Sequence, residues 1–298
     1  MTYTVRTERV TFDSAGHSLV GTLYRPAVQG RTPAVVVAGS WTTVKEQMAA
    51  VYARRMAEAG LTALAFDFTG FGESGGEPRQ LEVPDRKIRD IRSAVGFLAE
   101  HESAAPGRIG ALGICAGSGY IAVNAAEDRR VRSLALVAPW LHDPELVKGV
   151  YGGTNGVQKR LDAGLAARRR YEKGEAVQYV PAVSATDPDA AMFGPFDYYL
   201  DDKRGAVPSW DNRFAVMSWL DWLSFDPHPA AAGITAPTMM VHSRDAALPQ
   251  GAQKFHEALG GPKRIVWTDG TQFDFYDQDE KVAEAADIAA RHFTETLA

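Results

Sequence analysis

The stretch Gly113-Ile114-Cys115-Ala116-Gly117 contains the residue types and spacing most suited to chemistry. The apolar run "RIGALGI" precedes Cys115 and the helical pattern "SGYIAVNAAE" follows it, so the cysteine is expected on a sharp turn between a strand and a helix. Small residues permit such a turn, and the positive end of a helix favours a thiolate. The pattern predicts a nucleophile, and the alternative is a small buried apolar residue.

Composition and charge narrow the class of protein. The chain has 298 residues, 45% of them hydrophobic, and a formal net charge of -5. This is enough for a large core, and the mixed charges argue against a nucleic-acid partner. The one basic cluster, Arg168-Arg169-Arg170, is interpreted as a solvated helix face.

Cysteine count and hydropathy indicate the compartment. A single cysteine excludes an internal disulfide and fits a reducing environment. The first residues, "MTYTVRTERVTF", contain no apolar stretch of signal-peptide length, and no run of about 18 apolar residues occurs. The sequence therefore predicts a soluble, cytoplasmic protein without a membrane partner.

Two kinds of apolar pattern alternate along the chain. "YTVRTERVTF" and "SLVGTLYRP" predict half-buried strands joined by a hairpin turn at residues 14–17. Later apolar runs predict parallel strands buried on both faces, namely "PAVVVAG", "LTALAFDF", "RIGALGI", "VRSLALVAP", "PTMMVHS" and "KRIVWT". Helical patterns separate most of them, at residues 44–60, 85–100, 250–260 and 280–297. This alternation predicts an α/β protein with a doubly wound, mostly parallel sheet.

Residues 141–235 interrupt the alternation. They contain no convincing strand but several helical pieces, including "FDYYL" and "WDNRFAVMSWLDWLSF". An insertion of this length is too long for a loop. We expect a core domain formed by residues 1–140 and 236–298, with residues 141–235 as a helical cap over the carboxyl ends of the strands.

Three stretches together resemble the α/β-hydrolase superfamily over nearly the whole chain. Gly39-Ser40-Trp41 is similar to the oxyanion loop of that fold, and Gly113 to Gly117 to its nucleophile turn. "FDFTGFGESGG" is similar to its D-x-R-G-x-G-x-S turn, with Thr69 in place of the usual arginine. Within the superfamily, "GSWTTVKEQM" and "GICAGSGY" resemble a dienelactone-hydrolase-like subgroup that also contains polyketide transferases.

The resemblance implies a set of catalytic roles. Cys115 matches the nucleophile, and Asp245, in "VHSRDAALP", matches the acid after the penultimate strand. The backbone N–H groups of Trp41 and Ala116 match the oxyanion hole. Two alternatives stay open: Asp245 could cap the helix that begins near Pro249, and Trp41 could pack beneath the cap.

The base position is the main departure from the family pattern. The slot after the last strand contains Gln272, and a glutamine cannot take a proton at neutral pH. His242 and His228 lie near the penultimate strand and are the alternative bases, although neither has the family's position. The remaining histidines are expected in solvent or in packing, namely His17, His101, His142, His256 and His292.

Three accounts of Gln272 follow from these residues. It is an engineered histidine replacement, or the native residue of an enzyme that uses its pocket for transfer or cyclisation, or part of a ligand-binding protein that is no longer an enzyme. Because a cysteine can be acylated without a base, we favour an enzyme acting on an ester, thioester or lactone.

The substrate and partner expectations are correspondingly broad. Aromatic residues of the expected cap indicate a sizeable apolar carbonyl substrate, namely Tyr198, Tyr199, Trp210, Trp219 and Trp222. The sequence has no dense His/Cys/Asp cluster and no phosphate loop, so we expect neither a metal nor an organic cofactor. It is compatible with a monomer or a homo-oligomer.

Overall fold

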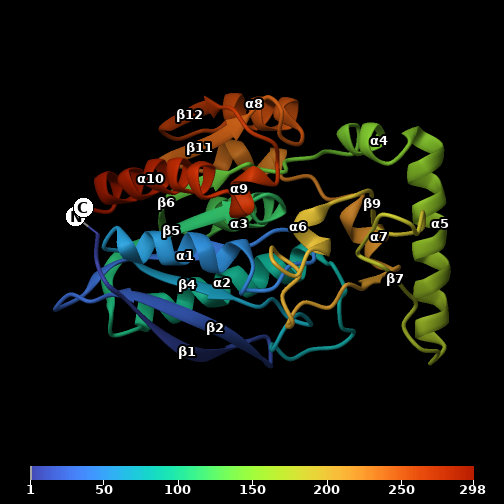
Figure 1. The fold of residues 1–298 in the computed structure, drawn as a ribbon, viewed down its shortest axis with the longest axis horizontal. Coiled ribbons are helices and arrows are strands. Elements are labelled where there is room, and N and C mark those ends of the chain that lie inside the picture. Colours follow the sequence, from blue (N-terminus) through green and yellow to red (C-terminus); the bar gives the residue numbers. More distant parts are fainter. Residues whose placement is uncertain (1) are drawn as a thin grey trace.

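A twisted sheet runs through the computed structural model, which describes residues 2–298 (Figure 1). Its strand order is β1-β2-β4-β3-β5-β6-β11-β12, with β1 and β2 antiparallel and the strands from β4 to β12 parallel. The strands are β1 (Val5–Ser14), β2 (His17–Pro26), β3 (Thr32–Ala38), β4 (Thr62–Phe66), β5 (Ala104–Ile114), β6 (Val131–Val137), β11 (Thr238–Ser243) and β12 (Lys263–Thr268). The predicted mostly parallel sheet is confirmed.

The amino-terminal hairpin forms where the alternating pattern predicted it. Ser14 of β1 pairs with His17 of β2 across a two-residue turn. Ala15 and Gly16 both have positive φ, 52° and 83°. Turns with two positive φ angles match the right-handed twist of paired strands, so this loop fixes the register of the hairpin.

Helices cover both faces of the sheet and explain why its central strands are continuously apolar. The helix α1 (Met48–Glu58) packs against α10 (Asp279–Thr296), and α2 (Pro84–Glu100) packs against α3 (Ala116–Glu127). The carboxyl-terminal part also contains α8 (Pro249–Ala258) and α9 (Asp274–Asp277). In β3, Val35, Val36 and Val37 are fully buried, as expected of a strand enclosed on both faces.

The segment between β6 and β11 differs in part from the helical cap that the sequence predicts. Its helices are α4 (Leu146–Val150), α5 (Gly153–Glu172), α6 (Asp197–Leu200), α7 (Ser218–Trp222) and the 3₁₀-helix η1 (His228–Gly233). It also contains two-residue strands, β7 (Tyr179–Val180), β8 (Val183–Ser184), β9 (Met192–Phe193) and β10 (Phe214–Ala215), which pair as two small sheets.

The absence of strands in this segment was therefore a wrong prediction. A two-residue strand is too short to produce an alternating pattern. Its pairing depends instead on contacts such as those of Asn212, whose side chain bonds both the N–H and the carbonyl of Val183. The long helix α5 lies at the edge of the molecule, far from the sheet (Figure 1). The division into a core domain and a cap domain stays a prediction.

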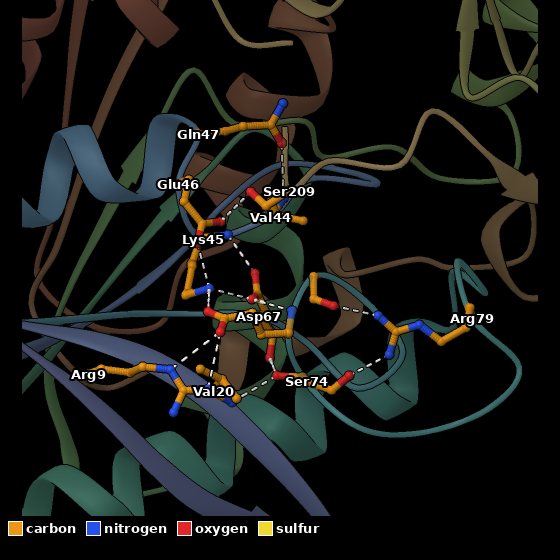
Figure 2. A network of polar contacts seen from close by, with 12 residues as sticks. Arg9, Val20, Val44, Lys45, Glu46, Gln47, Asp67, Ser74, Arg79 and Ser209 are labelled. Carbon is orange, nitrogen blue, oxygen red and sulfur yellow. Dashed lines mark hydrogen bonds and ion pairs between the residues drawn. The ribbon is translucent and has the colours of Figure 1, made fainter. Parts of the chain in front are cut away.

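A buried ion pair fastens the β3–α1 loop, residues 39–47, to the loop after β4 (Figure 2). The backbone N–H and the Nζ of Lys45 bind the carboxylate of Asp67 at 2.7 and 2.8 Å, and Nζ also binds Glu73 at 2.6 Å. Lys45 is 3% and Asp67 0% exposed. Burial lowers the pKa of Lys45, but the hydrogen bonds that Lys45 donates to Asp67, Glu46 and Glu73 outweigh this effect and raise the pKa. The lysine therefore stays charged, and losing either partner would leave an unpaired buried charge.

The same lysine explains why three acidic side chains lie close together beside it. One carboxylate oxygen from each of Glu46, Asp67 and Glu73 lies within 4.8 Å of the others. The ammonium group of Lys45 bonds all three carboxylates. The positive charge that holds this cluster together therefore comes from the protein itself.

The turn at residues 66–76 keeps its shape with threonine in place of the arginine of the family pattern. Thr69 donates its N–H and its hydroxyl to the buried carboxylate of Asp90. Arg79, ten positions later in the chain, donates to the carbonyls of Gly72 and Ser74 (Figure 2). A guanidinium group is therefore present at the turn, supplied from another position.

No helix within residues 2–298 is both long enough and apolar enough to cross a membrane.

Candidate active site

Cys115 occupies a strained turn between β5 and α3, as its sequence context predicted. Its φ of 53° lies in the left-handed region, which is costly for a residue with a side chain. Neighbouring backbone holds this conformation: Cys115 donates its N–H to the carbonyl of Val137 and accepts the N–H of Trp140, at 3.1 and 3.0 Å. The hydroxyl of Ser118 also donates to the carbonyl of Gly113, which closes the turn.

The two glycines that flank this turn are required by close backbone contacts. A Cβ added to Gly117 would lie 2.3 Å from the carbonyl oxygen of Gly39 and 2.6 Å from that of Ala38. A Cβ at Gly113 would lie 2.5 Å from the Cα of Ser118. Because these neighbours are backbone atoms, they cannot move aside as a flexible side chain would. Gly117 lets the start of α3 approach the end of β3, and Gly113 lets it approach the end of β5.

Cys115 lies at the wall of a cavity of about 700 Å³. From the loops at the carboxyl ends of the strands, the cavity is lined by Ser40, Trp41, Cys115, Ala116, Gln272 and Tyr276. From the segment between β6 and β11, its walls include Val150, Tyr151, Arg160, Phe193, Tyr199 and Trp222. The structure thus brings together the sequence-predicted residues Cys115, Ala116, Trp41 and Gln272. A cavity of this volume suits a small organic ligand.

The thiol of Cys115 is largely protonated at neutral pH. Its side chain is 5% exposed. Burial raises the pKa of Cys115 above its ordinary value of 9.0, and hydrogen bonds from Ser40, Tyr276, Gln272 and the N–H of Ala116 only partly oppose this effect. The sequence predicted that the helix end would increase the thiolate fraction. Desolvation outweighs that contribution, because removing a charge from water costs more than the nearby dipoles return.

Gln272 uses its whole side-chain amide to join three loops. Its Nε2 donates to the carbonyl of Ala138, after β6, at 2.9 Å and to the hydroxyl of Tyr276 at 3.1 Å. Its Oε1 accepts the N–H of Ala247, after β11, at 3.0 Å. The amide is therefore a structural connector beside the thiol, and it has no basic lone pair at neutral pH.

Tyr276 is a polar residue of the site that the sequence analysis did not single out. It lies one helical turn after Gln272, so the two side chains fall on the same face, and this spacing was the available signal. Tyr276 lines the cavity together with Cys115 and Ser40, and hydrogen bonding from Tyr276 acts to lower the pKa of the thiol. Burial, and then the neighbouring Cys115 and Tyr199, raise the pKa of Tyr276 well above 10.0. Tyr276 therefore keeps its proton at neutral pH and does not act as a base.

Within the described chain, the backbone N–H of Trp41 is a free hydrogen-bond donor on a residue that lines the cavity. Trp41 and Ala116 both line the cavity, and the Trp41 N–H has no hydrogen-bond acceptor within residues 2–298. The indole ring packs against Phe214 and Trp222, with centroid distances of 4.8 and 5.0 Å. The ring of Trp41 therefore packs beneath the aromatic segment, which is the alternative role considered for this residue. Its backbone N–H is still free to donate a hydrogen bond.

Glu82 holds the loop that presents this donor. One of its carboxylate oxygens accepts the N–H of Thr42 at 3.1 Å, and the other accepts the hydroxyl of Tyr120 at 2.8 Å. Lys87 lies 2.5 Å from Glu82, and both side chains are buried. Thr42 directly follows Trp41 and has a φ of 60°. The buried carboxylate therefore stabilises a strained residue beside Trp41.

Asp245 follows β11, as the resemblance implied, but its side chain is not among those that line the cavity. It is exposed, does not line the cavity, and its carboxylate makes no hydrogen bond or ion pair within residues 2–298. It does not cap α8 either, because the residue before that helix is Leu248 and no side chain bonds its first turn. Gln272 offers no imidazole N–H for a carboxylate to accept, and its amide bonds other loops.

The alternative bases His242 and His228 do not reach the cavity. His242 is fully buried beside Trp267, does not line the cavity, and burial lowers its pKa to about 4. His228 is bonded to Asp226 and to the carbonyl of Gly251. Among residues 2–298, no histidine lines the cavity.

His142 supports the cavity wall from behind. Its Nδ1 accepts the indole N–H of Trp140 at 2.9 Å, so its Nε2 donates to the carbonyl of Trp222 at 3.0 Å. Burial lowers the pKa of His142 to about 4, which keeps the ring neutral. Of the aromatic residues expected to contact substrate, Tyr199 and Trp222 line the cavity. Tyr198, Trp210 and Trp219 contribute to the packing around it instead.

The chain is similar to proteins whose activities have been named. Residues 33–285 match the sequence model described as the Alpha/beta hydrolase family. The polyketide transferase claH of Penicillium crustosum is 30% identical, with 87% of each chain covered. The thiohydrolase aneE of Aspergillus aculeatus is 28% identical, covering 85% of this chain and 81% of that protein.

A solved structure extends the similarity to the arrangement of the elements. The crystal structure of hypothetical protein PA2218 from Pseudomonas aeruginosa superimposes with a TM-score of 0.86 at 27% identity. The superposition covers 98% of this chain and 94% of that one. The resemblance therefore includes the segment between β6 and β11 as well as the sheet.

Replacing Gly117 by alanine tests the close contact at the start of α3. Since the added Cβ would meet two backbone carbonyls, we expect Gly117→Ala to lower the free energy of unfolding in urea by ~1–3 kcal/mol. Gly149→Ala, in α4, is the matched control because a Cβ there meets no atom within 4 Å. Equal stability of Gly117→Ala and the wild type would contradict the contact.

The pH dependence of alkylation tests the environment of the thiol. Because the pKa of Cys115 is raised, the thiolate fraction should still be increasing at pH 9.0, and the iodoacetamide rate should rise through that pH without a plateau. Tyr276→Phe removes a hydrogen bond to the thiolate and should slow alkylation at each pH. Intact mass measures the rate, and Cys115→Ala provides the blank. A plateau below pH 9.0 in the folded protein would show that the thiol is acidic instead.

Proposed function

The chain belongs to the alpha/beta hydrolase family, as its motifs predicted, and from this premise we propose that it is an acyl-transferring enzyme. In this proposal Cys115 attacks the carbonyl carbon of an ester, thioester or lactone. The observation that carries the proposal is the position of Cys115, on a strained turn at the wall of an aromatic cavity, beside a glutamine where a base would be expected. No histidine among residues 2–298 lines that cavity.

The proposed reaction has two balanced steps. The sulfur of Cys115 forms a bond to the carbonyl carbon, and the bond from that carbon to the leaving oxygen or sulfur breaks. The leaving group takes up the thiol proton, and the acyl group remains on Cys115 as a thioester. An acceptor hydroxyl, amine or thiol then attacks this thioester, and its proton returns to Cys115.

In this proposal, hydrogen-bond donors supply most of the stabilisation of the negative charge that develops during the reaction. The N–H groups of Trp41 and Ala116 would bind the oxygen as negative charge develops on it, and donors of this kind can contribute several kcal/mol. Tyr276 and Ser40 would donate to the sulfur when it is anionic. Exchange between thioesters suits such a site, because the proton ends on the departing thiol and needs no separate base.

Transfer is favoured over hydrolysis because water is a poor nucleophile without a base. The amide of Gln272 donates to Ala138 and Tyr276 and accepts from Ala247, so it neither takes a proton nor orients a base. These three hydrogen bonds support the account in which glutamine is the native residue. The names of the relatives, polyketide transferase and thiohydrolase, support an acyl substrate.

The cavity indicates the size and polarity of the substrate in this proposal. Its volume of about 700 Å³ and its aromatic walls suit an apolar acyl chain of moderate length. Residues 141–235 would then act as the cap that contributes these walls. The native reaction requires no metal or organic cofactor, because each step uses groups of the chain itself.

Trapping the acyl intermediate is the direct test of this function. We expect an activated thioester that fits the cavity to add one acyl group to the protein by intact mass, located on Cys115 by peptide mapping. Water should release the group slowly and an added thiol or amine acceptor should release it faster. Prior alkylation should abolish the adduct, and Cys115→Ala should not form it.

The matched control is Cys115→Ser, which keeps a nucleophilic oxygen but is far less reactive without a base. Covalent catalysis is wrong if no adduct appears and Cys115→Ala converts a substrate as fast as the wild type. The site would then act through binding and orientation alone.

Installing a base at position 272 tests why the enzyme would not hydrolyse its substrate. We expect Gln272→His to increase ester hydrolysis by ~10²-fold, the lower end of general-base effects, because Asp245 is too exposed to orient the imidazole. The rate of p-nitrophenyl butyrate hydrolysis measures the effect. Gln272→Ala is the control, since it removes the same hydrogen bonds without adding a base. A folded Gln272→His protein no faster than Gln272→Ala would exclude this slot as a base position.

A further inference from the structure

Arg160 is the one residue with a permanent charge among those lining the cavity within residues 2–298. It comes from α5, in the segment between β6 and β11, whereas Cys115 comes from the start of α3. The remaining lining residues are apolar, aromatic or uncharged polar. A single cation in such a wall is a specific feature that the proposed chemistry at Cys115 does not use.

The guanidinium group of Arg160 is held in place by contacts that use only part of it. Its Nη1 donates to the carbonyls of Tyr151 and Gly156, both at 3.0 Å. Its carbon Cζ lies 5.0 Å from the ring centre of Tyr151 and 5.3 Å from that of Trp219. The Nε and Nη2 groups donate no hydrogen bond within residues 2–298. The group is therefore fixed in orientation and keeps N–H donors for a ligand.

No carboxylate of the protein neutralises Arg160. Within residues 2–298 it forms no ion pair, although other basic residues of α5 do. Asp189, which follows the lining residue Pro188, pairs with Lys159 at 3.8 Å. Asp221 pairs with Arg168 at 2.7 Å. These two acidic side chains are thus paired with basic residues other than Arg160.

The cavity extends from the buried thiol to the surface near α5. Val150 and Phe193 line it and are 42% and 56% exposed, so they mark its opening, while Cys115 is 5% exposed. Arg160 is partly exposed, and α5 lies at the edge of the molecule (Figure 1). A ligand with its carbonyl at Cys115 would reach Arg160 with another part of its structure.

We propose that Arg160 binds an anionic group, a carboxylate or a phosphate, which the substrate carries away from its reacting carbonyl. A fixed guanidinium with free N–H donors suits both groups, because each offers two oxygens to its planar fork. This inference rests on the proposed function for the identity of the cavity as a substrate site. The substrate class becomes an apolar acyl compound with a negatively charged end.

Equilibrium binding of unreactive ligands tests the anion site independently of any covalent step. The probes are monoamides of linear dicarboxylic acids, from succinic to sebacic, each compared by calorimetry with its neutral diamide. The amide takes the place of the reacting carbonyl and the carboxylate is the charged end. For at least one chain length we expect the monoamide to bind about tenfold more tightly than its diamide.

Substitutions in α5 test whether Arg160 causes the preference for the monoamide. Arg160→Gln should abolish the preference, while its affinity for the diamide reports whether the cavity is intact. Arg160→Lys should keep part of it, because lysine keeps the charge and loses the fork. Arg169→Gln is the matched control, since it removes one charge from an exposed position of the same helix that does not line the cavity.

A second pair of ligands tests the kind of anion that binds, and the same measurements include results that would overturn the proposal. Octyl phosphate compared with octanol shows whether a phosphate is also preferred to a neutral group. Equal binding of charged and neutral ligands at every length and for both anions would overturn the proposal, as would a preference that survives in Arg160→Gln. If that variant does not fold, an undiminished preference in Arg160→Lys overturns it. Failure to acylate Cys115 would refute the proposed function and leave this binding result unaffected.

Discussion

The close approach of Gly117 to the carbonyls of Ala38 and Gly39 is the constraint on which the site depends. It sets the first turn of α3 directly against the end of β3. Ala116 and Trp41 then line the same cavity, and Cys115, which directly precedes Ala116, has a left-handed conformation. A larger residue at position 117 would push α3 away from β3, and the site residues on the two segments would move apart.

Buried charges hold the loops that this contact brings together. Lys45 and Asp67 fix one end of the β3–α1 loop, and Glu82 accepts the N–H of Thr42 in its middle. Buried ion pairs contribute little net stability because desolvation offsets their attraction. Their effect here is on geometry: each carboxylate accepts backbone N–H groups and determines where the adjoining donor points. Stability comes instead from the apolar packing of the sheet and its helices.

The polar groups around Cys115 define a site that donates hydrogen bonds and accepts no proton. Tyr276 keeps its proton because burial raises its pKa. The amide of Gln272 is already hydrogen-bonded to Ala138, Ala247 and Tyr276. Burial also raises the pKa of the thiol itself. Such an environment stabilises negative charge on a carbonyl oxygen better than it activates water. The cation of Arg160 completes this pattern, since it too favours negative charge, at the α5 side of the cavity.

Local sequence determined the strands of the main sheet, most of the helices and the turn that carries Cys115, because apolar periodicity and small residues act over a few positions. It could not determine the partners of Gln272, which come from loops after β6 and β11 and from α9. Nor could it reveal that Asp245 is exposed, that β7 to β10 pair as two-residue strands, or that Arg160 lines the cavity. Those features arise from contacts between segments far apart in the chain. The pKa values and hydrogen-bond partners of these side chains depend on burial, and side chains become buried only when the segments pack together.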